Sequence, residues 1–130
     1  MTRVYLDSSA IFKLEHHELE TLALVDFLEV GSIEASTSVI GEVEVCRHLI
    51  SRKLDHKHAM KGFYLIPIDD EIRRRAIDLG HTTVRALDAI HVATALAIAD
   101  RDVQFITYDE RQAVAARAAG LKVIQPGRAC

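Results

Sequence analysis

The chain has no tryptophan, and aromatic residues make up only 5% of its 130 residues. RNA-binding sheets of the RNP or OB type stack bases on aromatic side chains, so this composition argues against such platforms. An excess of positive charge is also lacking, because 16 Lys and Arg residues stand against 19 Asp and Glu residues, a formal net charge of −3. A polybasic nucleic-acid binder normally carries a clearly positive total.

Cysteines and long apolar runs are equally scarce. The two cysteines, Cys46 and Cys130, form no CxxC pair and no metal-finger spacing, so we expect no disulfide and a reducing, cytoplasmic setting. The apolar run at the N-terminus is too short for a signal peptide. The longest apolar stretch, 86–99, contains Asp88 and His91 and is shorter than the roughly 20 residues of a membrane span. We therefore expect no membrane partner.

The remaining composition is typical of a globular protein, with 49% apolar and 27% charged residues, and the length suits one domain, 1–130. Short apolar segments that predict strands alternate with longer segments that predict helices. The strands are expected at Val4–Leu6, Glu34–Thr37 (a weak pattern), Tyr64–Ile68, Gln104–Thr107 and Lys122–Ile124. The helices are expected at Ser8–Glu15, Glu18–Val30, Val39–Leu54, Glu71–Leu79, Leu87–Ala99 and Glu110–Ala119. Segment 55–62 is compatible with a loop or a short helix. This alternation predicts an α/β fold, a three-layer α/β/α sandwich around a mostly parallel sheet of four to five strands.

Three aspartates follow strands or open helices. Asp7 comes directly after the first strand, Asp109 follows the fourth, and Asp88 begins a helix that is apolar on nearly every side. Ligands of open α/β sheets bind beyond the carboxyl ends of the strands. Helix capping explains Asp7 equally well, and Asp109 forms a capping-box pattern with Gln112. A carboxylate at Asp88 is costly unless it is paired, capped or metal-bound, and His91, one turn later, is either a core residue or a partner of a nearby acid.

The helix expected at Val39–Leu54 carries two glutamates. At about 100° per residue, an apolar stripe is expected to face the protein body. Its members are Val43, Cys46, Ile50 and Leu54. Glu42 then falls at the edge of this stripe and Glu44 faces solvent, so Glu42 is predicted to be the acid held near the protein.

If the strands are parallel, these four acids converge on one edge of the sheet. Carboxylates gathered in one cleft repel one another, and a divalent cation relieves the repulsion. Hard oxygen ligands favour Mg²⁺ or Mn²⁺, and such an ion can activate a water and neutralise charge on a phosphodiester. The metal would also supply the positive charge that the composition lacks.

Four segments together resemble PIN domains, in particular the VapC type of toxin ribonuclease. They are Val4-Tyr-Leu-Asp-Ser-Ser-Ala10, Ser38-Val-Ile-Gly-Glu42, Arg85-Ala-Leu-Asp-Ala-Ile-His-Val-Ala-Thr-Ala95 and Ile106-Thr-Tyr-Asp109. The resemblance covers essentially the whole chain and implies Mg²⁺- or Mn²⁺-dependent endoribonuclease activity. Carried over by position, the catalytic acids would be Asp7, Glu42, Asp88 and Asp109. Of these, Asp7, Asp88 and Asp109 would bind metal, with Ser8 and Thr107 in supporting positions.

The same resemblance implies partners. A toxin of this type is neutralised by a small VapB-like antitoxin, commonly dimerises or forms a heteromeric complex, and reaches operator DNA only through the antitoxin. The segment 47–62 carries a charge sum of +4, from five basic residues and one acidic residue. Its basic residues would either track RNA phosphates or form a solvated helix end. The candidates for substrate binding are Arg47, Arg52, Lys53 and Lys57.

Two other interpretations remain open. A PIN-type nuclease of RNA processing would act without an antitoxin, and a short reading frame just upstream would distinguish the toxin from it. A non-catalytic phospho-receiver module also gathers acids beyond strand ends. Receivers usually have a lysine after the last strand, whereas Lys122 opens that strand, and the segment after Asp7 lacks a second aspartate.

Overall fold

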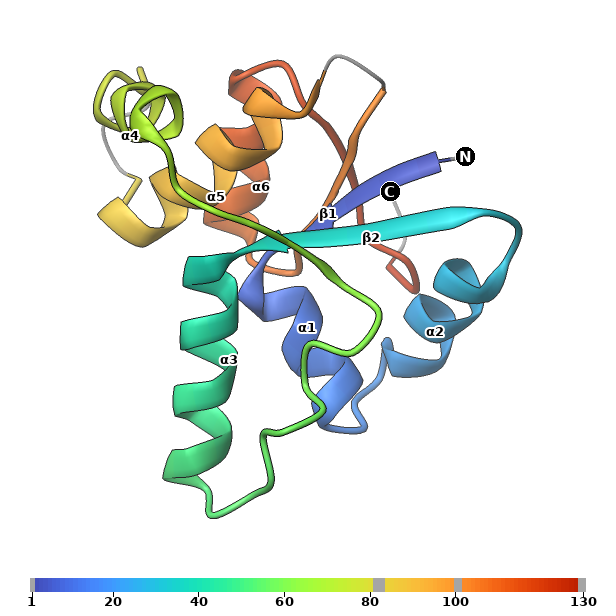
Figure 1. Ribbon diagram of the computed structural model, residues 1–130. Helices are drawn as coiled ribbons and strands as arrows, with labels where there is room; N and C mark the ends of the chain where they lie inside the picture. The colour runs from blue at the N-terminus through green and yellow to red at the C-terminus, as the bar shows by residue number, and fades with distance from the viewer. Residues whose placement is uncertain (1, 81–83, 100–101, 129–130) are drawn as a thin grey trace.

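The computed structural model describes residues 2–80, 84–99 and 102–128, so Cys130 lies outside the described residues. Within these ranges the strands form one parallel sheet in the order β3-β2-β1-β4-β5 (Figure 1). The strands are β1 (Thr2–Leu6), β2 (Ile33–Ser38), β3 (Tyr64–Ile66), β4 (Gln104–Ile106) and β5 (Lys122–Ile124). The helices are α1 (Ser8–Glu15), α2 (Thr21–Glu29), α3 (Val39–Ser51), α4 (Asp70–Ile77), α5 (Ala86–Ala97) and α6 (Glu110–Ala118). The predicted fold class is confirmed.

The central strand β1 is buried on both faces, as a parallel strand between helical layers should be. Val4 and Leu6 pack into the cluster that contains Ile11 of α1, Leu24 of α2 and Val45 of α3. Tyr5 points the opposite way. It packs with residues of α5, β4 and α6, namely Val92, Ala95, Phe105 and Ala116. Figure 1 shows the result, with α1, α2 and α3 on one side of the sheet and α4, α5 and α6 on the other.

The boundaries differ from the predictions where polar residues or proline intervene. The weak strand predicted at Glu34–Thr37 is in fact longer, because β2 bonds to β1 on one side and to β3 on the other. Its Ser36 hydroxyl also donates to the Val4 carbonyl oxygen at 2.9 Å. Strand β3 stops at Ile66, directly before Pro67, which has no N–H for the ladder. Segment 55–62 forms turns rather than a helix.

All five strands of the described sheet run in parallel, so their carboxyl ends lie at one edge. Helix α1 starts two residues after β1 ends, α3 follows β2 without a gap, and α6 starts four residues after β4 ends. The N-termini of these helices therefore meet the strand ends, where the predicted acids lie. Within the described ranges, no helix is long and apolar enough to cross a membrane.

Candidate active site

Asp7 is both a helix cap and a buried acid. Its side chain is 3% exposed, and its Oδ1 atom accepts hydrogen bonds from the Ala10 backbone N–H at 3.1 Å and the Ser9 hydroxyl at 2.6 Å. Its Oδ2 atom accepts a hydrogen bond from the Thr107 hydroxyl. Burial raises the pKa of the Asp7 carboxyl, although the charge of His91 and these three hydrogen bonds oppose the rise. The structure therefore confirms that Asp7 caps helix α1. The same carboxylate also lies at the carboxyl end of β1, so capping does not conflict with a role in a site at this edge of the sheet.

The Thr107 hydroxyl connects Asp7 with Asp109. Besides donating to Asp7, its Oγ1 atom accepts the backbone N–H of Asp109 at 3.1 Å. Asp109 caps α6, since its Oδ1 atom accepts the backbone N–H groups of Arg111 at 2.9 Å and Gln112 at 3.3 Å. The predicted capping box is only half formed, because the Gln112 side chain has no hydrogen-bond partner among the described residues. The Thr107 hydroxyl takes the N–H that the glutamine would have bonded.

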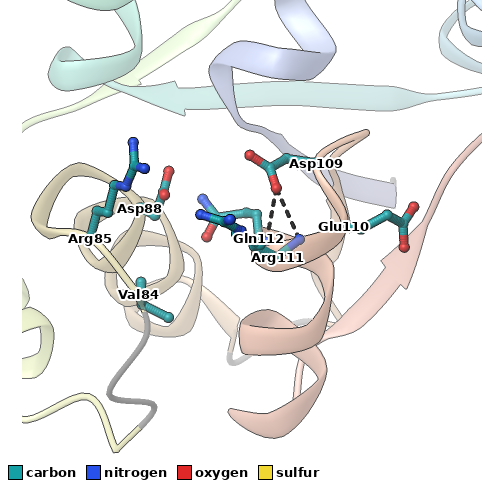
Figure 2. A pocket seen from close by; sticks show the side chains of 7 residues that line it. All are labelled: Val84, Arg85, Asp88, Asp109, Glu110, Arg111 and Gln112. Atoms are coloured by element: carbon teal, nitrogen blue, oxygen red, sulfur yellow. Dashed lines mark hydrogen bonds between the residues drawn. The ribbon is translucent and has the colours of Figure 1, made fainter.

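Asp88 lies in the first turn of α5, half-buried, in a cleft of about 240 Å³ that Asp109 also lines (Figure 2). Burial raises the pKa of its carboxyl, and the negative charges of Asp109 and Glu44 raise it further. The charges of His91 and Arg85 work in the opposite direction. Two acids predicted from separate motifs thus share one cleft, and a third acid, Glu44, is near enough for its charge to raise the pKa of Asp88.

The helical-wheel prediction for α3 was wrong. The buried residues of this helix are Gly41, Val45 and Leu49, whereas the predicted stripe residues Val43 and Ile50 are 54% and 42% exposed. The prediction assumed that the face with the large apolar residues is buried. The face that packs against the protein is instead the one that begins with Gly41. That glycine allows a close approach, since a Cβ at Gly41 would overlap the Thr37 hydroxyl and lie 3.3 Å from the His91 ring.

With the buried row corrected, the two glutamates lie on opposite flanks of α3. Glu44 faces α5, and its Oε1 atom lies 2.6 Å from Nε2 of His91. Glu42 lies on the flank towards α1, where its charge and that of Glu15 add to the effect of burial in raising the pKa of the Cys46 thiol. Glu44 does not face solvent as predicted, since its side chain is only 24% exposed. The sequence reasoning missed this residue, and the i, i+4 spacing of Gly41, Val45 and Leu49 was the signal that could have found it.

His91 is the buried link behind the acids. It is 1% exposed, and its Nδ1 atom lies 2.6 Å from the Tyr5 hydroxyl. Both interpretations of His91 hold, since it is a buried core residue and also hydrogen-bonds an acid, Glu44. The row Tyr5–His91–Glu44 thus connects the central strand, α5 and α3 at the edge of the sheet where Asp7 lies.

Comparison with known proteins identifies the family. Residues 4–118 match the PIN domain. The chain belongs to the PIN-domain family. Among its PIN-domain relatives, ribonuclease VapC47 of Mycobacterium tuberculosis is 32% identical over 132 residues, covering 95% of this chain and 97% of that protein. Ribonuclease VapC46 of the same species is 35% identical over 130 residues, covering 97% and 99%. The family match argues against the receiver-domain interpretation.

Solved structures share the PIN fold at low sequence identity. VapC20 of M. tuberculosis, described as a toxin that cleaves the sarcin–ricin loop, has a TM-score of 0.74 at 14% identity and covers 95% of this chain and 99% of its own. A toxin–antitoxin complex from Klebsiella pneumoniae has a TM-score of 0.72 at 21% identity, covering 93% and 95%. VapBC2 from Rickettsia felis, bound to a DNA fragment from its promoter, has a TM-score of 0.73 at 11% identity, covering 96% and 99%.

Within this PIN fold, Ser9 makes the contacts that the resemblance assigned to Ser8. Its hydroxyl donates to Asp7, lies 3.2 Å from the Thr107 hydroxyl and accepts the Tyr108 backbone N–H at 2.9 Å. Among the described residues, the hydrogen bonds around Asp7 and Thr107 involve the Ser9 hydroxyl and not that of Ser8. The two serines are adjacent in sequence, and the direction in which α1 leaves β1 decides which of them contacts Asp7.

The four predicted RNA-binding residues lie away from the cleft. Arg47, Arg52, Lys53 and Lys57 are exposed, in the second half of α3 and the turns that follow it. Helix α3 has 13 residues, so its far end lies about 20 Å from the sheet edge. Figure 1 shows α3 running away from the sheet. The arginines that line the cleft with Asp88 and Asp109 are instead Arg85 and Arg111, which the sequence analysis did not select.

In the described part of the chain, no three His, Cys, Asp or Glu side chains are arranged closely enough to hold a metal ion as they stand. The structure nevertheless brings Asp88 and Asp109 to one cleft and bonds both Asp7 and Asp109 to the Thr107 hydroxyl. Glu44 hydrogen-bonds His91, which lies on α5, the helix that carries Asp88. The chemical resources of the site are therefore carboxylate oxygens, hydroxyl groups that orient them, and two guanidinium groups.

Proposed function

We propose that this PIN-domain protein is a Mg²⁺- or Mn²⁺-dependent endoribonuclease that hydrolyses RNA phosphodiester bonds and acts as the toxin of a toxin–antitoxin pair. One observation carries the proposal: Asp88 and Asp109 line one cleft, and the Thr107 hydroxyl joins the backbone of Asp109 to the carboxylate of Asp7. The relatives called ribonuclease VapC match almost the full chain and support the same function.

The side chains at this edge fit a hard divalent cation. Burial raises the pKa of Asp7, and burial together with the charges of Asp109 and Glu44 raises that of Asp88, so a cation would find carboxylates whose repulsion it relieves. Asp7, Asp88 and Asp109 would hold it, directly or through water, and we assign the fourth acid to Glu44 in place of Glu42. Held by these residues, such a cation would supply the means to activate a water and to neutralise charge on the phosphodiester.

The chain's own hydrogen bonds prepare these acids for that task. Ser9 and Thr107 bond opposite oxygens of the Asp7 carboxylate, which fixes its orientation. His91 does the same for Glu44, and because the Tyr5 hydroxyl bonds its other nitrogen, the imidazole cannot turn freely. Groups that orient metal ligands in this way commonly affect activity by about 10- to 100-fold.

A VapB-like antitoxin is the proposed partner, with operator DNA bound only through that antitoxin, and the toxin itself forming a homodimer or a heteromeric complex. Solved toxin–antitoxin complexes with this fold support the proposal. The chain also offers apolar surface for a partner around α2. The side chains concerned are Leu19 (93% exposed), Leu22 (66%) and Val30 (69%).

The deciding experiment is RNA cleavage by the purified protein. We expect cleavage of structured RNA with Mg²⁺ or Mn²⁺, no cleavage in EDTA, and recovery when the metal is restored. Asp7→Asn and Asp88→Asn should each abolish cleavage while the far-UV circular dichroism spectrum stays that of a folded protein. Full activity in EDTA would disprove the metal mechanism. Sequencing of RNA 5′ ends after brief induction would then name the cleaved RNA.

The toxin role has a separate test. We expect the product of a short reading frame next to this gene to co-purify with the protein and to stop RNA cleavage. DNA from the promoter of that gene pair should bind the complex but not the isolated protein. If the protein cleaves RNA but no neighbouring gene product inhibits it, the ribonuclease activity stands and a role in RNA processing is favoured over the toxin role.

A further inference from the structure

The cleft between α5 and α6 is lined by a buried glutamine, Gln112, whose side-chain amide has no hydrogen-bond partner among the described residues. Gln112 is 1% exposed and lies on α6, three residues after Asp109. Neither its Oε1 nor its Nε2 atom has a hydrogen-bond partner within the described ranges. Such a buried amide is unfavourable, because folding has removed its water without replacing the lost bonds. Native proteins keep few such groups, so a ligand that completes the bonds is a physical reason for its presence.

Gln112 shares this cleft with the guanidinium groups of Arg85 and Arg111. Arg85 precedes the first turn of α5, Arg111 lies in the first turn of α6, and both side chains are exposed. Neither belongs to an ion pair among the described residues. Figure 2 shows Arg85 beside Asp88, and the side chains of Arg111 and Gln112 extending from α6 towards α5. The cleft therefore combines two anion-binding groups with an amide that can both donate and accept.

The size and chemistry of the cleft suit one unit of a nucleic acid chain. Its volume of about 240 Å³ is below that of most drug-sized sites, which hold roughly 300–1,000 Å³. Guanidinium groups match phosphate oxygens in charge and geometry. A carboxamide presents a donor and an acceptor side by side, as the edges of nucleobases do, and unpaired RNA bases are read along those edges.

Building on the function proposed above, we propose that Arg85, Arg111 and Gln112 form a nucleotide subsite for the RNA substrate, in which the arginines hold phosphates and Gln112 reads the edge of one base. The amide is buried in the ligand-free chain, so this contact requires neighbouring side chains to shift. Arg85 and Arg111 line the same cleft and are exposed, so movement of their side chains costs little packing. Gln112 is then a residue that determines which nucleotide lies beside Asp88 and Asp109.

Replacing the amide tests the proposal because stability and function should separate. Gln112→Met keeps a similar volume and removes both unpaired polar atoms, so we expect an unfolding temperature equal to or above that of the wild type. We expect kcat/KM for the preferred RNA to fall about 5- to 100-fold. The nucleotide preference in sequenced 5′ ends should flatten. Unchanged rate and preference would overturn the proposal, as would an activity loss that only follows a loss of folded protein, the result expected if the amide held a structural water.

The arginines provide variants that do not disturb the core. Arg85→Ala and Arg111→Ala should each weaken RNA binding and lower the salt dependence of log Kd by about one unit. The matched control is Arg117→Ala, which removes an exposed arginine of the same helix α6 outside the cleft and should bind like the wild type. If all three variants lose the same amount of RNA affinity, the effect is one of net charge alone, and the proposed subsite is overturned.

The two proposals fail in different ways. If the wild-type protein cuts no RNA with Mg²⁺ or Mn²⁺, the ribonuclease function fails. If the wild type cuts RNA and the Gln112 and Arg111 variants match its rate, preference and salt dependence, the nucleotide subsite alone fails.

Discussion

The Nε2 atom of His91 lies 2.6 Å from Oε1 of Glu44, although 47 positions separate the two residues in the chain. The imidazole is buried, and its other nitrogen bonds to the Tyr5 hydroxyl. An acid held in this way has a fixed direction, and that direction is towards α5 and Asp88. The relationship therefore decides which of the two glutamates near the start of α3 belongs with the other acids.

Exchanging each glutamate for glutamine distinguishes the two. Glu44→Gln should lower the initial rate of RNA cleavage by about 10- to 100-fold, because the amide keeps the hydrogen bond to His91 but loses the charge. Glu42→Gln, two positions away on the opposite flank, is the matched control and should cleave at nearly the wild-type rate. Thermal unfolding of both variants checks that the fold is intact. A silent Glu44→Gln beside an impaired Glu42→Gln would return the role to Glu42.

Asp88→Asn should separate stability from metal binding. Burial, and then the negative charges of Asp109 and Glu44, disfavour the Asp88 carboxylate, so in EDTA the neutral variant should unfold at a temperature equal to or above that of the wild type. Millimolar Mg²⁺ should raise the unfolding temperature of the wild type, since the ion binds only the folded chain, and should have little effect on the variant. Differential scanning fluorimetry measures both. An equal Mg²⁺ response in the two proteins would argue against Asp88 as a ligand.

Gly41→Ala should be destabilising, although alanine is normally the better helix residue by about 1 kcal/mol. The added methyl group would overlap the Thr37 hydroxyl and approach the His91 ring. Overpacking of this kind costs about 1–3 kcal/mol, measurable by urea unfolding. The Thr37 hydroxyl has no partner within the described residues, so Thr37→Ala removes it cheaply. The double variant should therefore recover part of the loss, and a Gly41→Ala protein as stable as the wild type would contradict the close approach.

Glu20 should make stability depend on acidity. Its buried carboxylate lies 2.8 Å from Nζ of Lys13 and 2.8 Å from Nε of Arg128, and these bonds lower its pKa from 4.5 to about 2. A lowered pKa adds stability above the unfolded value, and this stability is lost as pH falls from about 4.5 towards 2.

The test is Glu20→Gln, compared with the wild type by urea unfolding at pH 7 and at several acidic pH values. The variant should be less stable by up to about 3 kcal/mol at pH 7. The difference from the wild type should shrink through the acidic range, because the wild type then loses the same charge. A difference that stays constant from pH 7 to pH 2 would show that the ion pairs contribute nothing through this charge. Glu18→Gln is the control, since Glu18 also contacts Lys13 but is 45% exposed.

Much of the fold was predictable because the alternation of apolar strands and helices is a local property of the sequence. The central strand is apolar at each of Val4, Tyr5 and Leu6, as a strand between two helical layers must be. The weak prediction for β2 shows the limit. Four of its six residues are polar, and its strand character comes from the backbone bonds to β1 and β3, which are distant in sequence.

The candidate site divides along the same line. Asp7, Asp88 and Asp109 were found because each occupies a local position, a strand end or the first turn of a helix. Glu44 and Ser9 were missed because their roles depend on how α3 packs against α5 and how α1 leaves β1. The sequence predicts that the Gln112 side chain bonds the backbone N–H of Asp109 in a capping box. In the structure the Thr107 hydroxyl accepts that N–H instead, which the spacing of Asp109 and Gln112 could not indicate.

What the sequence determined by itself is therefore the order of strands and helices, the parallel sheet and the placing of three aspartates at its carboxyl edge, since periodicity and position along the chain carry that information. Which glutamate joins them, which serine orients Asp7 and which arginines line the cleft was decided only by the tertiary structure. The physical reason is that each of these depends on the rotation of a helix about its own axis, and that rotation is set by packing between residues far apart in the chain, such as Gly41 against Thr37 and His91.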